Sequence, residues 1–221
     1  MSMRLYSGPL SMFGAKAEIA ALEKGLDVQV EMVRFDMKSL YEPKHPEVLR
    51  VNPKRQVPVL IDGDLEIFDS TQIFEYFEEI KPQPPLWPTG VKGRARARLL
   101  EMKSDEVFFP HIIRLMGLQR ALDDPAATTA IGGATAYYRD LEALLADGRD
   151  GLAGEYSYAD IAFYMAQFFA DRLGAPMPAD VGRLLAWRER VGARPAVRQV
   201  ATAMARYLVS VGGRKPGFIA L

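Results

Sequence analysis

The sequence predicts a protein in two parts, an α/β domain followed by an all-α domain. Strand-like and helix-like patterns alternate through residues 1–80, a proline-rich stretch follows at residues 81–88, and strand patterns almost disappear beyond it. Proline-rich stretches of this kind form extended connectors. We therefore predict one domain over residues 1–81, a linker over residues 82–89, and an all-helical domain over residues 90–221.

The first elements follow from short periodic patterns. Residues 3–6 form a predicted strand, and a Ser-Gly-Pro turn at residues 7–9 follows it. The apolar residues Ala15, Ile19 and Leu22 have the spacing of one helical face, and Gly25 is a suitable residue to end that helix. Residues 28–35 alternate like a second strand. The chain therefore begins strand, helix, strand.

A second group of elements lies between residues 57 and 80. Residues 57–61 have strand propensity but contain Pro58, which cannot donate a ladder hydrogen bond, so this strand is expected to lie at an edge or to bend there. A cis Val57-Pro58 bond is accessible, because it costs an X-Pro peptide only about 0.5–1 kcal/mol. An Asp-Gly turn at 62–63 leads to a strand over 65–68. Asp69 and Ser70 then begin a helix whose buried face is Ile73, Phe74, Phe77 and Ile80. The order βαβ-ββα is that of a thioredoxin-like domain.

Helical patterns fill the second part, over residues 99–118, 134–145, 158–173, 181–191 and 196–209. Pro110 is expected to kink the first of these helices, because proline lacks the N–H that an α-helix uses. Ser157 and Asp160 have the spacing of a capping box and predict the start of the helix at residue 158.

The composition narrows the classes of function. Lys+Arg and Asp+Glu are equal at 28 each, which gives no general attraction to nucleic acid or to an anionic membrane. The chain has no cysteine and two histidines, so we expect no metal site, and any thiol chemistry must come from a ligand. The first residues lack a signal-peptide pattern, and the expected location is the cytoplasm.

Residues 51–70 together suggest a cradle for a peptide-like ligand. A strand that bends at Pro58 leaves the N–H and C=O of Val57 free to pair with an extended ligand. The helix that begins at Asp69 and Ser70 presents free N–H groups and the positive end of its dipole, both of which favour a carboxylate. The alternative is that Asp69 and Ser70 only cap the helix.

The chain resembles the soluble glutathione S-transferases, as a bacterial member. In that family an Asn-Pro-x-Gly-x-Val-Pro-x-Leu segment precedes Glu/Asp-Ser at a helix start, and a Leu-Ala-Gly-x-x-Ser-x-Ala-Asp segment lies in the helical domain. The matching residues here are Asn52, Pro53, Val57, Pro58, Leu60, Asp69 and Ser70, with residues 152–160 for the second segment. Arg55 stands where the pattern has glycine, so a side chain is expected to reach toward the site.

The resemblance implies a glutathione site without a metal, in which the binding residues are Gln56, Val57, Pro58, Asp69 and Ser70. By position Ser11 matches the catalytic residue of serine-type transferases, whose hydroxyl stabilises the glutathione thiolate. Tyr6 and Ser7 are the alternatives, in that order, and Ser11 also fits as a simple helix cap. An electrophilic second substrate would contact Met12, Phe13, Phe108, His111, Ile112 and Met116, although apolar residues at helical spacing more often only pack in the core.

The function implied is a glutathione transferase that detoxifies a hydrophobic small molecule and, by resemblance, acts as a homodimer. The same site also suits a glutathione-dependent ether-cleaving lyase, a dehalogenase or an isomerase. A third possibility is a protein of the same fold that binds glutathione or a partner without turnover, because fold alone does not decide function.

Overall fold

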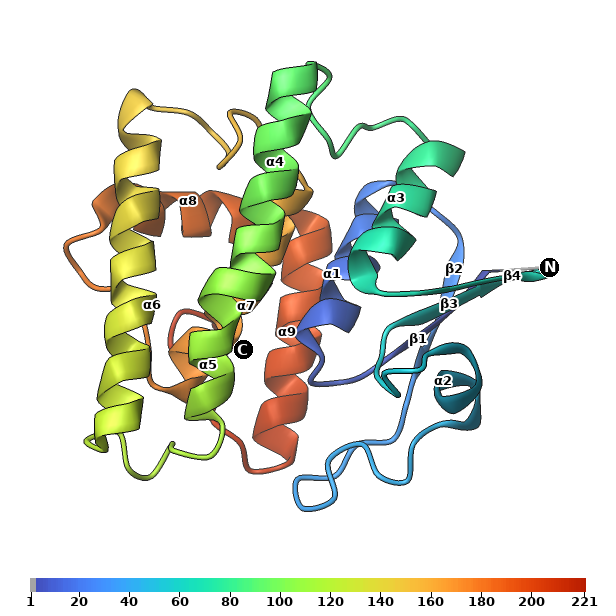
Figure 1. Ribbon diagram of the computed structural model, residues 1–221, viewed down its shortest axis with the longest axis horizontal. Coiled ribbons are helices and arrows are strands. Elements are labelled where there is room, and N and C mark those ends of the chain that lie inside the picture. The colour runs from blue at the N-terminus through green and yellow to red at the C-terminus, as the bar shows by residue number, and fades with distance from the viewer. Residues whose placement is uncertain (1–2) are drawn as a thin grey trace.

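The computed structural model describes residues 3–221 as two parts that lie side by side, a sheet with helices on both faces and a group of helices (Figure 1). The sheet part contains β1 (Met3–Ser7), α1 (Met12–Glu23), β2 (Val28–Met32), α2 (Pro46–Val51), β3 (Val59–Asp62), β4 (Leu65–Phe68) and α3 (Ser70–Ile80).

The four strands lie in the order β2-β1-β3-β4. Strand β1 pairs parallel with β2 and antiparallel with β3, and β3 pairs antiparallel with β4. Successive side chains of a strand point to opposite faces. Leu5 accordingly packs in the core shared with α1 and α3, whereas Tyr6 packs with Val48 of α2 on the other face. The predicted thioredoxin-like arrangement is confirmed.

Some details of this part differ from the sequence prediction. Strand β1 extends to Ser7, one residue beyond its predicted end, and β3 begins at Val59 instead of residue 57. Strand β2 ends at Met32, three residues before the predicted end at 35. Helix α2 was not predicted, because six residues are too few to show helical periodicity. It begins with Pro46, a favourable first residue, and is capped by His45, whose Nδ1 accepts a hydrogen bond of 3.3 Å from the Glu47 N–H.

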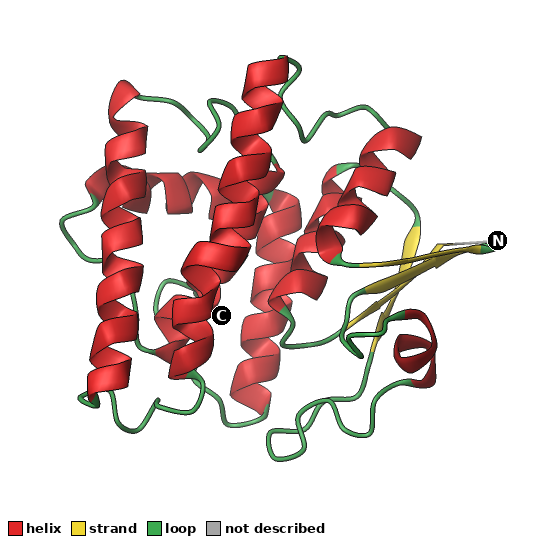
Figure 2. Ribbon diagram, viewed as in Figure 1, coloured by secondary structure: helices red, strands yellow, loops and turns green. Residues whose placement is uncertain are grey.

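Beyond residue 90 every regular element is a helix, which confirms the all-α prediction (Figure 2). The elements are α4 (Val91–Lys103), a π-helical turn (Ser104–Phe108), α5 (Phe109–Leu115), α6 (Pro125–Leu144), a 3₁₀ turn (Leu145–Asp147), α7 (Tyr158–Leu173), α8 (Gly182–Gly192) and α9 (Pro195–Ser210). No helix within residues 3–221 has the length and apolarity needed to cross a membrane. The boundary at residues 82–89 remains a prediction.

The helix predicted over residues 99–118 is interrupted by a π-helical turn. Phe109 donates its N–H to Ser104, five residues back, immediately before Pro110. A wider turn at this point suits a residue that cannot donate a backbone hydrogen bond. Helix α6 begins nine residues before its predicted start at 134, with Asp124 as its cap. Its first turns contain Ala, Thr and Gly, which give little apolar periodicity.

Helix α7 lies at the centre of the helical part and is buried along its whole length. The predicted capping box is present: Asp160 accepts from the Ser157 N–H at 2.9 Å, and the Ser157 hydroxyl lies 3.1 Å from the same carboxylate. Asp160 also accepts from the Leu152 N–H at 2.8 Å and from Trp187 Nε1 at 2.7 Å. One carboxylate therefore fixes the start of α7, the preceding loop and α8.

A buried ionic cluster joins the two parts. Lys16 of α1 is fully buried, and its ammonium contacts Glu101 of α4 at 2.7 Å and Asp105 of the π-helical turn. Glu101 also accepts from the hydroxyl of Thr71 in α3 at 2.6 Å. Burial alone lowers the pKa of the Lys16 amine, but Asp105, Tyr158 and Glu101 together raise it above its ordinary value. The cluster thus keeps the Lys16 amine charged and holds α1 against the helical part.

Candidate functional site

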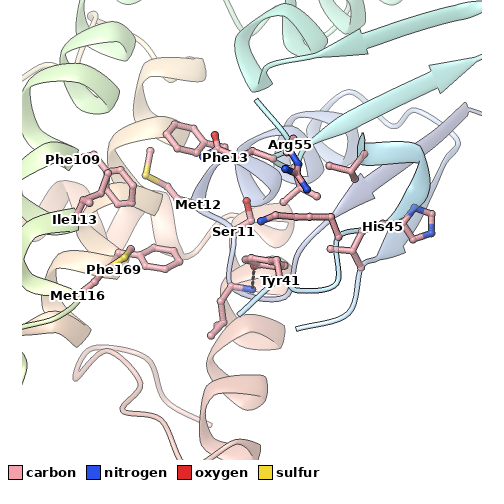
Figure 3. A pocket seen from close by; sticks show the side chains of 16 residues that line it. Ser11, Met12, Phe13, Tyr41, His45, Arg55, Phe109, Ile113, Met116 and Phe169 are labelled. Carbon is pink, nitrogen blue, oxygen red and sulfur yellow. Dashed lines mark hydrogen bonds between the residues drawn. The ribbon is translucent and has the colours of Figure 1, made fainter. Parts of the chain in front are cut away.

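A cleft of about 290 Å³ opens between the first turn of α1 and the helical part. Figure 3 shows Ser11 between two groups of lining side chains, one from α1 and the helical part and one from the loops of the sheet part. The first group is apolar: Met12, Phe13, Phe109, Ile113, Met116 and Phe169. The second contains the polar residues Tyr41, Lys44, His45, Arg55 and Gln56 together with the apolar residues Leu10, Val33, Val48 and Val57. The cleft therefore suits a ligand with one polar and one apolar portion.

Ser11 is the N-cap of α1 and 8% exposed. Its Oγ accepts a hydrogen bond of 3.0 Å from the Gly14 N–H, and within residues 3–221 its own hydroxyl hydrogen has no acceptor. A serine can cap a helix as an acceptor and still donate to a second group. The capping role and a thiolate-binding role are therefore compatible. Gly14 is required here, because a Cβ would clash with the Ser7 hydroxyl.

The two alternatives to Ser11 lie outside the cleft lining. The Ser7 hydroxyl is fully buried and donates to the carboxylate of Glu18 on α1. Tyr6 lies on the opposite face of the sheet, where its ring centroid is 4.9 Å from that of His45. Burial, followed by the effect of Glu31, raises the pKa of Tyr6, so its hydroxyl stays protonated. Neither hydroxyl faces the cavity that Ser11 lines.

The segment before β3 has the backbone geometry that its sequence suggests. The Val57-Pro58 bond is cis, the isomer that the sequence left open, and within residues 3–221 neither the N–H nor the C=O of Val57 has a hydrogen-bond partner. Asn52 holds the segment by donating to the Gln56 carbonyl at 2.6 Å. Gln56 and Val57 both line the cleft. An extended ligand there has a free backbone edge to pair with.

Arg55 occupies a left-handed backbone conformation, with φ of 58°. Glycine adopts this conformation without the steric cost that a Cβ carries, which explains its place in the family pattern. The Arg55 side chain lines the cleft together with Lys44, and the lining contains no carboxylate. The site therefore favours an anionic ligand.

Asp69 and Ser70 lie at the start of α3 and are not among the residues that line the cavity. Asp69 caps the helix by accepting from the Thr71 N–H at 3.0 Å, and its φ of 77° turns the chain sharply at this point. The Ser70 carbonyl accepts from the Tyr158 hydroxyl at 3.0 Å, whereas the Ser70 hydroxyl has no partner within residues 3–221. The donor needed for a carboxylate is therefore still free.

The apolar wall comes from a different face of α5 than the sequence suggests. Met12, Phe13 and Met116 line the cleft as expected, but Phe108 and Ile112 are fully buried in the core. His111 packs against Gly133 of α6 instead of facing the cleft. The lining residues of α5 are Phe109 and Ile113, one position further along the helix. Both faces are apolar, so periodicity does not tell the cleft face from the core face.

Phe169 of α7 and the loop residues Tyr41, Lys44 and His45 are further lining residues that sequence reasoning missed. Tyr41 closes the polar side, because its hydroxyl accepts from the Leu10 N–H at 3.2 Å. These residues come from segments without a recognisable motif. Within residues 3–221 no group of three or more His, Cys, Asp or Glu side chains is arranged to hold a metal.

Comparison with known proteins agrees with this architecture. Residues 5–85 match the family model described as glutathione S-transferase, N-terminal domain. A stringent starvation protein A homolog from Coxiella burnetii is 36% identical over 109 residues, which cover 48% of each chain. The match therefore spans only about half of the length of this relative.

Two longer matches extend beyond the N-terminal part. Glutathione S-transferase Z2 from Arabidopsis thaliana is 30% identical over 187 residues, which cover 78% of this chain and 76% of that protein. The crystal structure of a glutathione S-transferase from Rhodospirillum rubrum F11 superposes with a TM-score of 0.77 at 29% identity, covering 90% of this chain and 92% of that one. The chain belongs to the glutathione S-transferase family.

Proposed function

We propose that this protein is a serine-type glutathione transferase that binds glutathione in the cleft beside Ser11 and transfers its sulfur to an apolar electrophile. The observation that carries the proposal is the free hydroxyl hydrogen of Ser11 at the start of α1, between a cationic and an apolar wall. A protein of the same fold that binds glutathione or a partner without turnover is the second candidate, and the name of the Coxiella burnetii relative does not describe it as a transferase.

Glutathione fits the polar side of the cleft by its charge and by its backbone. Its peptide groups would pair with the free N–H and C=O of Val57, and Lys44 and Arg55 would attract its carboxylates. Asp69 and Ser70 would hold the end that carries an amine and a carboxylate: the Asp69 carboxylate faces the amine, and the Ser70 hydroxyl donates to the carboxylate.

The chemical step needs a thiolate, and a free thiol has a pKa of about 8.5. The hydroxyl of Ser11 and the positive end of the α1 dipole both stabilise the thiolate and lower that pKa. The thiolate then attacks the electrophile held against Phe109 and Ile113: a carbon–sulfur bond forms, and the leaving group departs with the bonding electron pair. Binding both reactants in one cleft supplies proximity.

We also propose, from the family resemblance alone, that the protein is a cytoplasmic homodimer with a role in detoxification. The identity of the electrophile sets the reaction class, so lyase, dehalogenase and isomerase activities remain candidates on the same site. Fold does not choose among them.

The Ser70→Ala variant tests the position of the ligand. We expect glutathione to bind about tenfold or more weakly to it, because a hydrogen bond to a charged group typically contributes about 1.5–3 kcal/mol. Calorimetric titration of glutathione into the wild type and the variant measures the change. Ser210→Ala is the control, since Ser210 is exposed at the end of α9. Equal affinity for the wild type and Ser70→Ala would place the carboxylate elsewhere.

A further inference from the structure

A second cavity, separate from the cleft, lies between α8, α9 and the C-terminal segment. Its volume is about 280 Å³, and none of its lining residues lines the cleft. Side chains of Tyr164, Thr202, Phe218 and Ile219 form part of the wall. The residues that give the cavity its charge are two arginines, Arg188 and Arg198, and one exposed glutamate, Glu189.

The region around this cavity is basic, although the whole chain is neutral. From residue 181 to residue 221 the sequence contains seven arginines and one lysine, with Glu189 as the one acidic residue. Arg183 and Arg194 are paired, with Glu142 and Glu23 respectively. Within residues 3–221 Arg188 and Arg198 have no carboxylate partner. The two arginines that line the cavity are therefore available to an added anion.

Arg188 is held in place by stacking instead of by an ion pair. Its guanidinium carbon lies 4.4 Å from the centre of the Phe218 ring, and its Nε is buried without a hydrogen-bond partner in the described residues. A stacked guanidinium keeps its N–H groups pointing outward from the ring edge, where they match the oxygens of a phosphate or carboxylate. A buried donor without a partner is unfavourable until a ligand supplies an acceptor.

Neutral hydroxyl groups complete the set of donors. Tyr164 lines the cavity, and burial, which outweighs the opposing effect of Arg188, raises the pKa of its hydroxyl to about 12, so it remains a neutral donor. Thr202 lies one turn beyond Arg198 on α9 and lines the same cavity. Two cations and two hydroxyl groups beside an aromatic ring favour an oxyanion of more than one charge that carries an apolar group.

We propose that this cavity binds a small organic phosphate, whose phosphate group contacts Arg188 and Arg198 and whose apolar part packs against Phe218 and Ile219. A phosphate offers three oxygens to the two guanidinium groups and the hydroxyls, and the two arginines outnumber the one carboxylate of the lining, Glu189, so the cavity attracts an anion. The ligand would also fix the C-terminal segment, which Asp171 anchors at one point by accepting from the Gly217 N–H at 2.7 Å.

Calorimetric titration with phenyl phosphate tests this proposal on the whole protein, with benzoate and inorganic phosphate as comparison ligands. We expect phenyl phosphate to bind more tightly than either, because benzoate lacks the second charge and inorganic phosphate lacks the contact with Phe218. Binding of phenyl phosphate no tighter than that of benzoate, or no binding at millimolar concentration, would overturn the proposal.

Arg198→Gln is the decisive variant, because Arg198 is exposed and its replacement leaves the core unchanged. We expect it to weaken phenyl phosphate binding about tenfold or more. Arg206→Gln is the matched control: it removes an exposed arginine of α9 that does not line the cavity. An equal loss in both variants would show a general charge effect and would contradict a defined site. Glutathione affinity is measured in parallel and is expected to stay unchanged.

Discussion

Replacing Lys16 by methionine is expected to destabilise the protein by about 3–5 kcal/mol, the range found when one partner of a buried ion pair is removed. The variant leaves Glu101 and Asp105 buried together without the ammonium that both contact. Burial already raises the pKa of Asp105 to about 6 against the opposing effect of Lys16. Urea unfolding followed by circular dichroism at pH 7.5 measures the loss.

Two further variants separate the lost charge from the changed shape. Lys16→Met combined with Asp105→Asn removes one of the uncompensated charges and is expected to recover part of the stability. Lys81→Met is the control, since Lys81 is a surface residue whose ammonium, among residues 3–221, donates a hydrogen bond only to the Gly25 carbonyl, at 2.7 Å. A loss below about 1 kcal/mol for Lys16→Met, within the range of surface pairs, would contradict the structural role given to the cluster.

Replacing Glu18 by glutamine is expected to stabilise the protein at pH 8 and to have little effect at pH 4.5. Glu18 is buried beside the Ser7 hydroxyl and has no cation partner within residues 3–221. Burial raises the pKa of its carboxyl from 4.5 to about 7, although the Ser7 hydrogen bond opposes the shift. The charged form is therefore unfavourable in the folded protein.

The direction in which the free energy of unfolding changes with pH follows from proton binding. Between about pH 4.5 and pH 7 the folded protein holds a proton that the unfolded chain releases, so the free energy of unfolding falls as pH rises. The full loss in the free energy of unfolding that Glu18 causes is on the order of 3 kcal/mol above pH 7, at 1.36 kcal/mol for each unit of pKa. Glutamine keeps an acceptor for Ser7 without the charge.

Urea unfolding of the wild type and Glu18→Gln at several pH values measures this difference. The free energy of unfolding of the variant should exceed that of the wild type increasingly between pH 4.5 and pH 7. Glu155→Gln, which replaces an exposed glutamate, should show no such trend. A difference between Glu18→Gln and the wild type that is constant with pH would mean that Glu18 is already ionised at low pH in the folded protein.

The fold was largely predictable because its strands and long helices carry regular apolar patterns. Gly25 ends α1 with φ of 57°, and the Ser157–Asp160 pair starts α7, as their positions indicated. The elements that were missed lack such patterns: α2 has six residues, and the start of α6 contains mostly small side chains. The π-helical turn before Pro110 depends on packing between helices, which a linear pattern does not contain.

The candidate site was predictable where backbone geometry defines it and less so where packing does. The interruption of the strand at Pro58 and the capping of α3 by Asp69 follow from residue types with restricted conformations. The apolar wall does not, because α5 has two apolar faces, and tertiary packing assigns one to the core and the other to the cleft. The loop that contributes Lys44 and Tyr41 has no local signal at all.

Ultraviolet difference titration of the protein with glutathione, from about pH 5 to pH 9 around the thiol pKa of about 8.5, tests the central claim most directly. We expect the wild type to show thiolate absorbance below the pKa of the free thiol. In Ser11→Ala the pKa of the bound thiol should rise by about one unit or more, the size of one hydrogen bond to a charged group.

Two controls accompany this titration. Ser11→Thr keeps both the cap and the hydroxyl donor and should resemble the wild type. Asp124→Ala removes the cap of α6 and controls for a general loss of stability. A bound thiol that titrates like free glutathione, with the same pKa in the wild type and Ser11→Ala, would contradict a serine-type glutathione transferase; absence of binding at every pH would favour a partner-binding protein instead.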